Sequence, residues 1–208
     1  HMLETVPFPT GTVEVTLDGA GIPSYEIRQG VAWDNIPFTP QIEELARHTR
    51  AACFGSLAQR SPVSHRTIGR FLETMPDGEG QYKVFDINLR QHFYTQQVVE
   101  ESLRKCNILK INDEELAVIG GMFGMEGMQP GEQCRTLLDR YGLRIVILTC
   151  GAAGSSVFAP DTRSYIPTPR VEVADTVGAG DSFTASFLAA LLSGLGIGEA
   201  HRLAVDVA

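Results

Sequence analysis

Residues 175–183 bring together small residues and a carboxylate in a way that suits phosphate chemistry. They read Asp-Thr-Val-Gly-Ala-Gly-Asp-Ser-Phe, and an apolar run with helical periodicity follows. The N–H groups of Gly178, Ala179 and Gly180 therefore meet the positive end of a helix dipole, where glycines let a phosphate approach closely. Asp181 is placed to accept a proton from a hydroxyl that attacks this phosphate. The alternative is that Asp181 only caps the helix.

A second group of polar residues follows an apolar strand. In the run Phe-Asp-Ile-Asn-Leu-Arg at 85–90, the alternation of a strand sends Asp86, Asn88 and Arg90 to one side. An acid, an amide and a guanidinium would then share one face at a strand end. These residues predict part of a binding site, and the alternative is an exposed polar strand end.

Two further strand ends carry candidate site residues. Asn112 and Glu115 have the spacing of a helix capping box, which by itself explains both residues. Thr149, Gly151 and Gly154 form a T-x-G-x-x-G turn after an apolar strand. A tight glycine turn is the simplest interpretation of this turn.

These residues belong to alternating helical and extended segments. The periodicities predict helices over 41–49, 63–75, 96–105, 131–141 and 182–194, and strands over 51–55, 82–87, 107–111 and 144–149. Such alternation predicts an α/β fold with a mostly parallel sheet flanked by helices. Ligands of such sheets bind beyond the carboxyl ends of the strands, where the polar groups above are expected.

The N-terminal part has a different pattern. Residues 12–17 alternate apolar with polar, 18–23 supply turn residues, and 24–28 resume an extended pattern. We expect a small β-hairpin within residues 1–36, hinged on a core of residues 37–208.

The composition narrows the class of partner. The chain has 208 residues, a formal net charge of −8 and a pI near 5.1, so a nucleic-acid or anionic-membrane partner is not expected. No apolar run reaches the roughly 20 residues that span a bilayer. The four cysteines form no C-x-x-C pair, which predicts reduced thiols and a cytoplasmic location. A small-molecule partner fits best.

The segment at 175–183 strongly resembles the C-terminal signature of the ribokinase-like (PfkB) carbohydrate kinases, D-T-x-G-A-G-D. The resemblance extends from about residue 10 to the end of the chain. It implies a ribokinase-like fold in which the hairpin is a lid over the sugar. A peripheral hairpin, or a homodimer contact through the lid, is the alternative for that hairpin. The implied reaction is transfer of the γ-phosphoryl group of Mg-ATP to a sugar hydroxyl.

The resemblance also implies roles for the candidate residues. Asp181 would be the catalytic base, and the amides of residues 178–180 would form the anion hole. The nucleotide would be bound by residues that match the family's phosphate-contacting positions: Lys110, Thr149, Gly151, Gly154 and Thr176. The run Asp86, Asn88 and Arg90 resembles fructokinases and 2-keto-3-deoxygluconate kinases, where it lines the substrate side. Asn112 and Glu115 would belong to the Mg²⁺ environment, with Glu115 acting through water.

The chain departs from the family pattern at both ends, and a truncated kinase is expected. No glycine-glycine motif with an Asn precedes the hairpin, and the sequence stops inside an apolar helix. Fructose is the expected sugar, with ribose and 2-keto-3-deoxygluconate as alternatives. A non-catalytic nucleotide-binding module is the rival from another class. A dehydrogenase is not expected, because no G-x-G-x-x-G follows a first strand.

Overall fold

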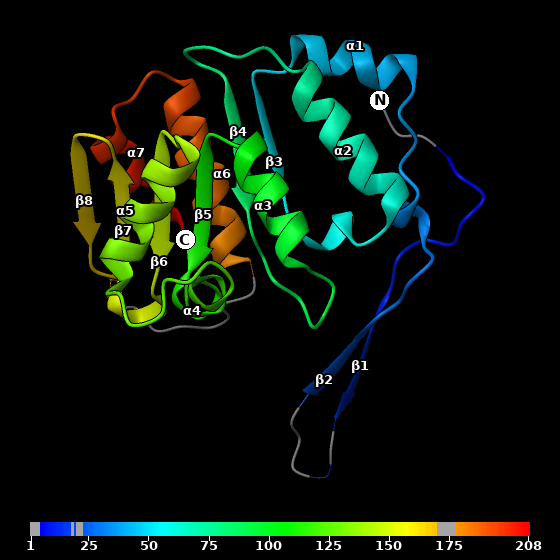
Figure 1. The fold of residues 1–208 in the computed structure, drawn as a ribbon, viewed down its shortest axis with the longest axis horizontal. Helices are drawn as coiled ribbons and strands as arrows, with labels where there is room; N and C mark the ends of the chain where they lie inside the picture. The colour runs from blue at the N-terminus through cyan, green and yellow to red at the C-terminus, as the bar shows by residue number, and fades with distance from the viewer. Residues whose placement is uncertain (1–4, 18, 20–22, 170–177) are drawn as a thin grey trace.

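A sheet of six strands forms the centre of the protein (Figure 1). The computed structural model describes residues 5–17, 19, 23–169 and 178–208. The strands, in both chain and spatial order, are β3 (Ala51–Phe54), β4 (Tyr82–Asp86), β5 (Ile108–Asn112), β6 (Ile145–Thr149), β7 (Ser155–Ala159) and β8 (Thr162–Ile166). Pairing is parallel from β3 to β6 and antiparallel from β6 to β8. The mostly parallel sheet predicted from the sequence is confirmed.

Helices cover both faces of this sheet. On one face lie α3 (Gln96–Lys105), α4 (Asp113–Met122) and α5 (Pro130–Tyr141), and on the other lie α6 (Ala179–Leu192) and α7 (Ile197–Val207), as Figure 1 shows. The alternation of side chains along β4 explains the two layers. Val84 packs toward α6 and α7, whereas Phe85 packs toward α3, α4 and α5.

Two more helices flank the first strand of the sheet. They are α1 (Pro40–His48) and α2 (Pro62–Thr74), and a small cluster of Ala46, Leu72 and Met75 joins them. Short 3₁₀ turns complete the chain: η1 (Ala32–Asp34), η2 (Leu57–Gln59) and η3 (Gly151–Ala153).

Local signals fix where the helices begin and end. Thr39 and Thr95 accept hydrogen bonds from the N–H groups three residues later, which cap α1 and α3. Gly142 ends α5 with a φ of 62°, a conformation that glycine adopts at little cost. The expected boundaries of these helices agree with the structure to within a residue. No helix in the described ranges is long and apolar enough to cross a membrane.

The N-terminal strands β1 (Val13–Leu17) and β2 (Pro23–Ile27) form the expected antiparallel hairpin. It extends away from the body and pairs with no strand of the large sheet (Figure 1). The chain then passes through η1 to α1. The strand β8 was not predicted, because its exposed, polar sequence gives a weak signal.

Candidate active site

The N-terminus of α6 is the centre of the candidate site. Gly178 caps the helix with a φ of 85°, which favours glycine, and its carbonyl accepts the helical hydrogen bond of Ser182. The N–H groups before Ser182 have no acceptor within the helix, so the helix itself leaves them available to an anion. Asp181 lies in this first turn and is exposed. The helix begins three residues earlier than predicted, so Gly180 and Asp181 lie inside its first turn rather than before it.

The helix turns its apolar side to the sheet. Phe183 and Phe187 are buried and stack with their ring centroids 6.3 Å apart. Ala190 and Leu191 continue the same face. This is the face that the sequence periodicity predicted, and its burial leaves Asp181 on the solvent side of the first turn.

A buried ion pair lies beside this helix terminus. Asp86, the last residue of β4, accepts a hydrogen bond of 3.2 Å from the Lys110 ammonium of β5. Its other carboxylate oxygen accepts one of 2.9 Å from the Thr184 hydroxyl of α6. Both charged residues are only 8% exposed. The Lys110 Nζ lies 3.1 Å from the position that a Cβ on Gly180 would take, so the ammonium faces the glycine turn.

Cys53 of β3 lies close to the same carboxylates. It pairs with Val84 of β4, so its side chain shares a sheet face with Asp86. Removal of water by the surrounding protein raises the pKa of this thiol, and the negative charges of Asp86 and Asp181 raise it further, to about 11. At neutral pH the thiol is therefore protonated, which makes it a poor nucleophile.

The predicted shared face of Asp86, Asn88 and Arg90 is wrong. Strand β4 ends at Asp86, and Asn88 has a φ of 44°, so the two-residue alternation stops there. Asp86 is held in the buried ion pair. Arg90 is exposed, and its guanidinium donates to the carbonyl of Leu89. Asn88 points elsewhere, into a pocket described below.

Asn112 and Glu115 form the capping box of α4. The Asn112 side chain accepts from the Glu115 N–H at 2.7 Å, and the Glu115 carboxylate accepts from the Asn112 N–H at 3.0 Å. The other Glu115 oxygen accepts from the Leu89 N–H at 3.0 Å. Glu115 therefore joins the start of α4 to the loop after β4.

This arrangement does not fit direct Mg²⁺ coordination. Both Glu115 oxygens already accept backbone N–H groups, and the side chain is buried. Within the described ranges, no three His, Cys, Asp or Glu side chains gather as ligands for a metal ion. A carboxylate oxygen has a second lone pair, so Glu115 can still accept from water around an ion carried by a nucleotide.

The turn after β6 contains the other candidates. Thr149 pairs with Asn112 of β5, so the two strand ends are neighbours. Gly151 has a φ of 49°, and no atom within 4 Å would contact a Cβ there. At Gly154 a Cβ would lie 2.5 Å from the Ile166 carbonyl oxygen. Close packing against β8 is thus a sufficient reason for this glycine. Thr176 lies outside the described residues.

A cluster around Arg60 joins the hairpin to the body. Its guanidinium pairs with Asp34 at 2.8 and 3.0 Å and donates to the Arg28 carbonyl. It lies between two rings, 4.1 Å from the centroid of Trp33 and 4.5 Å from that of Phe93. Burial raises the pKa of Asp34, but the hydrogen bonds from Arg60 and the N–H of residue 31 outweigh this, so the pKa is lowered. No local sequence pattern predicts this cluster, because its members come from four separate segments.

A pocket of about 270 Å³ opens beside this cluster. It is lined by residues of η1 and by residues that follow β3 and β4: Trp33, Gly55, Leu57, Ala58 and Asn88. A Cβ on Gly55 would lie 3.1 Å from the Asp86 carbonyl oxygen, so the pocket adjoins the strand that carries the ion pair.

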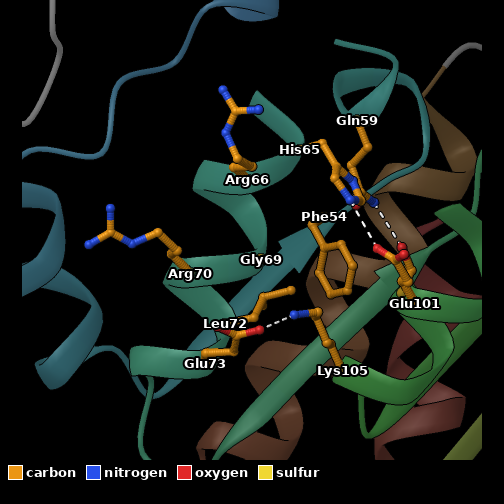
Figure 2. Close-up of a pocket in the computed structure, with 11 residues that line it drawn as sticks. Phe54, Gln59, His65, Arg66, Gly69, Arg70, Leu72, Glu73, Glu101 and Lys105 are labelled. Carbon is orange, nitrogen blue, oxygen red and sulfur yellow. Dashed lines mark hydrogen bonds and ion pairs between the residues drawn. The ribbon is translucent and has the colours of Figure 1, made fainter. Parts of the chain in front are cut away.

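Figure 2 shows a different pocket, of about 250 Å³, between α2 and α3. Phe54 lies at its centre and stacks on Phe85, so this pocket lies on the sheet face away from Asp86. Four of its charged groups form two pairs: His65 contacts Glu101 at 3.0 Å, and Lys105 pairs with a glutamate of α2. None of the residues that line this pocket belongs to the α6 terminus.

Residues 63–208 match the sequence profile of the pfkB family of carbohydrate kinases, and the chain therefore belongs to this family. It is 30% identical over 160 residues to a fructokinase of Rhizobium leguminosarum bv. trifolii, which covers 74% of this chain and 46% of that protein. It is 29% identical over 114 residues to the aminoimidazole riboside kinase of Salmonella typhimurium, covering 52% and 34% respectively. The chain spans about half the length of the first two curated relatives it matches.

Solved structures confirm the ribokinase-like fold. A sugar kinase of Pyrococcus horikoshii in complex with ATP superposes with a TM-score of 0.76 at 24% identity, over 98% of this chain and 65% of that one. Arabidopsis thaliana ribokinase complexed with ribose and ATP gives 0.73 at 23% identity, over 96% and 62%. The family and fold expected from the segment at 175–183 are thus confirmed.

Proposed function

We propose that this chain carries the phosphoryl-transfer site of an ATP-dependent sugar kinase that phosphorylates a sugar hydroxyl. The observation that carries the proposal is the first turn of α6. There an exposed carboxylate, Asp181, lies in the same turn as backbone N–H groups without a helical acceptor, next to the ammonium of Lys110. Such a terminus can hold a phosphoryl group and a base together.

In this mechanism Asp181 accepts the proton of the attacking hydroxyl, a contribution of typically about 10²- to 10⁴-fold. The N–H groups of residues 178–180 and the helix dipole stabilise the charge that develops on the transferred group. Lys110 adds a buried positive charge beside them, although Asp86 neutralises part of it. When ATP is bound, its Mg²⁺ would neutralise part of the phosphate charge. Asn112 and Glu115 act only by holding the neighbouring loop and water.

The pocket lined by Trp33, Gly55 and Asn88 is the proposed place for the sugar. It combines the Trp33 ring, suited to the apolar face of a sugar, with the Asn88 amide, which can bind hydroxyls. Fructose is the first candidate, because the fructokinase match extends over 160 residues at 30% identity, whereas a ribokinase of Arabidopsis thaliana matches over 115 residues at 33%. Ribose and 2-keto-3-deoxygluconate remain the alternatives. The turn at Thr149, Gly151 and Gly154, together with Thr176, is proposed to bind the nucleotide.

We also propose that two copies associate through the hairpin. One face of the hairpin is apolar and open to solvent: Val13, Val15, Leu17 and Tyr25 are each more than half exposed. The opposite face carries Glu14, Thr16 and Glu26. An isolated two-stranded hairpin is marginal in water, so a second hairpin packed on the apolar face would stabilise it.

Free cysteines among the described residues support a reducing cytoplasm as the location.

The test is a coupled assay of ADP release from Mg-ATP, with fructose, ribose, 2-keto-3-deoxygluconate or no acceptor. Release that depends on one sugar supports the proposal and names the acceptor. The variant Asp181→Asn should bind ATP nearly as the parent does and lose turnover. ATP binding without release for any sugar would favour the rival, a nucleotide-binding module without catalysis.

A further inference from the structure

The side chain of Thr184 ties the first turn of α6 to the sheet. Its hydroxyl lies 2.9 Å from Asp86 Oδ2 and 3.0 Å from the carbonyl oxygen of Gly180. Thr184 is 6% exposed, so water does not replace either contact easily. The hydroxyl has one proton, and donation to the charged carboxylate gives the stronger bond.

The carboxylate at the other end of this bond is itself fixed. Asp86 Oδ1 accepts from Lys110 Nζ at 3.2 Å, and that ammonium faces Gly180. Asp86 thus joins the end of β4, the middle of β5 and the start of α6. Without the Thr184 hydroxyl, Oδ2 would lose the only partner that the described structure gives it, and α6 would lose its polar tie to β4.

We propose that Thr184 is a positioning residue for phosphoryl transfer. Its bond to Asp86 sets the first turn of α6 against the sheet, and so sets where Asp181 and the N–H groups of residues 178–180 lie. Thr184 itself touches no reacting group. The proposal rests on the function proposed for Asp181, and it extends that function to a residue in the middle of an apolar helix face.

The ionisation of the Cys53 thiol reports the position of the first turn of α6, and measuring it does not require enzymatic turnover. The negative charges of Asp86 and Asp181 both contribute to the raised pKa of its thiol. If the first turn of α6 moves away from β3, the contribution of Asp181 falls and the thiol ionises at lower pH. Only the thiolate form of Cys53 is alkylated readily. The pH dependence of alkylation therefore reports the thiol pKa, and through it the position of Asp181.

The experiment compares Thr184→Val, which keeps the shape and removes the hydroxyl, with Thr184→Ser, which keeps the hydroxyl. For each variant, kcat and KM for ATP and the sugar are measured in the ADP-release assay. Alkylation of Cys53 by iodoacetamide is followed from about pH 8 to 10, with Cys53→Ser as the blank and Asp181→Asn as the reference for a lost charge. Urea unfolding shows that each variant folds.

The Thr184→Val change should lower kcat by on the order of tenfold to a hundredfold, with KM for ATP nearly unchanged, because a small misplacement of catalytic groups is costly. It should also shift the alkylation profile toward lower pH, as Asp181→Asn does. The Thr184→Ser variant should restore both properties.

Wild-type kcat and a wild-type alkylation profile in Thr184→Val would overturn the proposal. Equal shifts in the Val and Ser variants would also overturn it, because packing and not the hydroxyl would then be responsible. If the wild-type chain itself shows no turnover with any sugar, the proposed function fails, yet the alkylation profiles still decide whether Thr184 positions Asp181.

Discussion

Acid should destabilise the protein through His201. This residue of α7 is fully buried against the β7–β8 hairpin. Its Nε2 lies 2.8 Å from the Ser155 hydroxyl, and its Nδ1 lies 2.8 Å from the Ser164 hydroxyl. The Phe183 ring contacts it edge-on. Burial lowers the pKa of His201 from about 6.5 to about 4. The folded protein therefore holds the ring neutral at pH values at which the unfolded chain protonates it.

The sign and size of the effect follow from this difference. Above about pH 6.5 both states are neutral at His201, and the full stability is present. As the pH falls toward 4, the unfolded chain binds a proton that the native state excludes, so the free energy of unfolding decreases. The coupling of protonation to folding lowers the free energy of unfolding by about 2 kcal/mol at pH 5. The decrease reaches about 3 kcal/mol once the pH lies below both pKa values.

Urea unfolding at about pH 7.5, 6 and 5 measures this loss, and the His201→Gln variant isolates it. Carboxylates elsewhere titrate in both proteins, so the difference between the two curves belongs to His201. Between pH 7.5 and 5, the free energy of unfolding of the variant should decrease by about 2 kcal/mol less than that of the parent. His48→Gln is the matched control, because His48 is largely exposed on α1. Parallel curves for the parent and His201→Gln would refute the reasoning.

Three other substitutions probe separate parts of the fold. Gly154→Ala should cost about 2 to 3 kcal/mol in urea unfolding, because its φ is 110° and a Cβ would meet a backbone carbonyl, whereas Gly198→Ala in α7 should be neutral or stabilising. Asp34→Asn should cost about 3 kcal/mol by leaving a buried guanidinium without its charged partner, and an unchanged urea midpoint would contradict this. Val15→Lys should dissociate a hairpin-mediated dimer in sedimentation velocity, whereas Thr16→Lys on the opposite face should not; a monomeric parent would refute the association.

Periodic patterns predicted the architecture well, because strands and helices place side chains on one face at fixed spacings along the chain. The alternation at 12–17 predicted β1, and the apolar spacing after Asp181 predicted the buried face of α6. The capping-box spacing of Asn112 and Glu115 predicted the start of α4. In each case the signal lies within a short run of consecutive residues.

Contacts between distant segments could not be predicted in this way. Thr184 gave no signal, because a lone threonine on an apolar helix face is unremarkable until Asp86, 98 residues away, is placed beside it. The alternation assumed for residues 85–90 failed for a similar reason. The N–H of Leu89 turns toward Glu115 on α4, and Asn88 adopts a positive φ.

The polar residues of the candidate site divide into two groups by what they bind. Asp86, Asn112 and Glu115 have their oxygens engaged with Lys110, Thr184 and backbone N–H groups, so they fix the shape of the site. Asp181 is exposed in the first turn of α6, where the N–H groups have no acceptor within the helix.

This division implies two kinds of mutant. Glu115→Gln should lower both stability and turnover, because the caps of α4 and of the loop after β4 weaken together. Asp181→Asn should lower turnover and leave the urea midpoint nearly unchanged, since no described hydrogen bond of the fold depends on that carboxylate. A large loss of stability in Asp181→Asn would place Asp181 among the residues that hold the fold and would remove the basis for its role as the base.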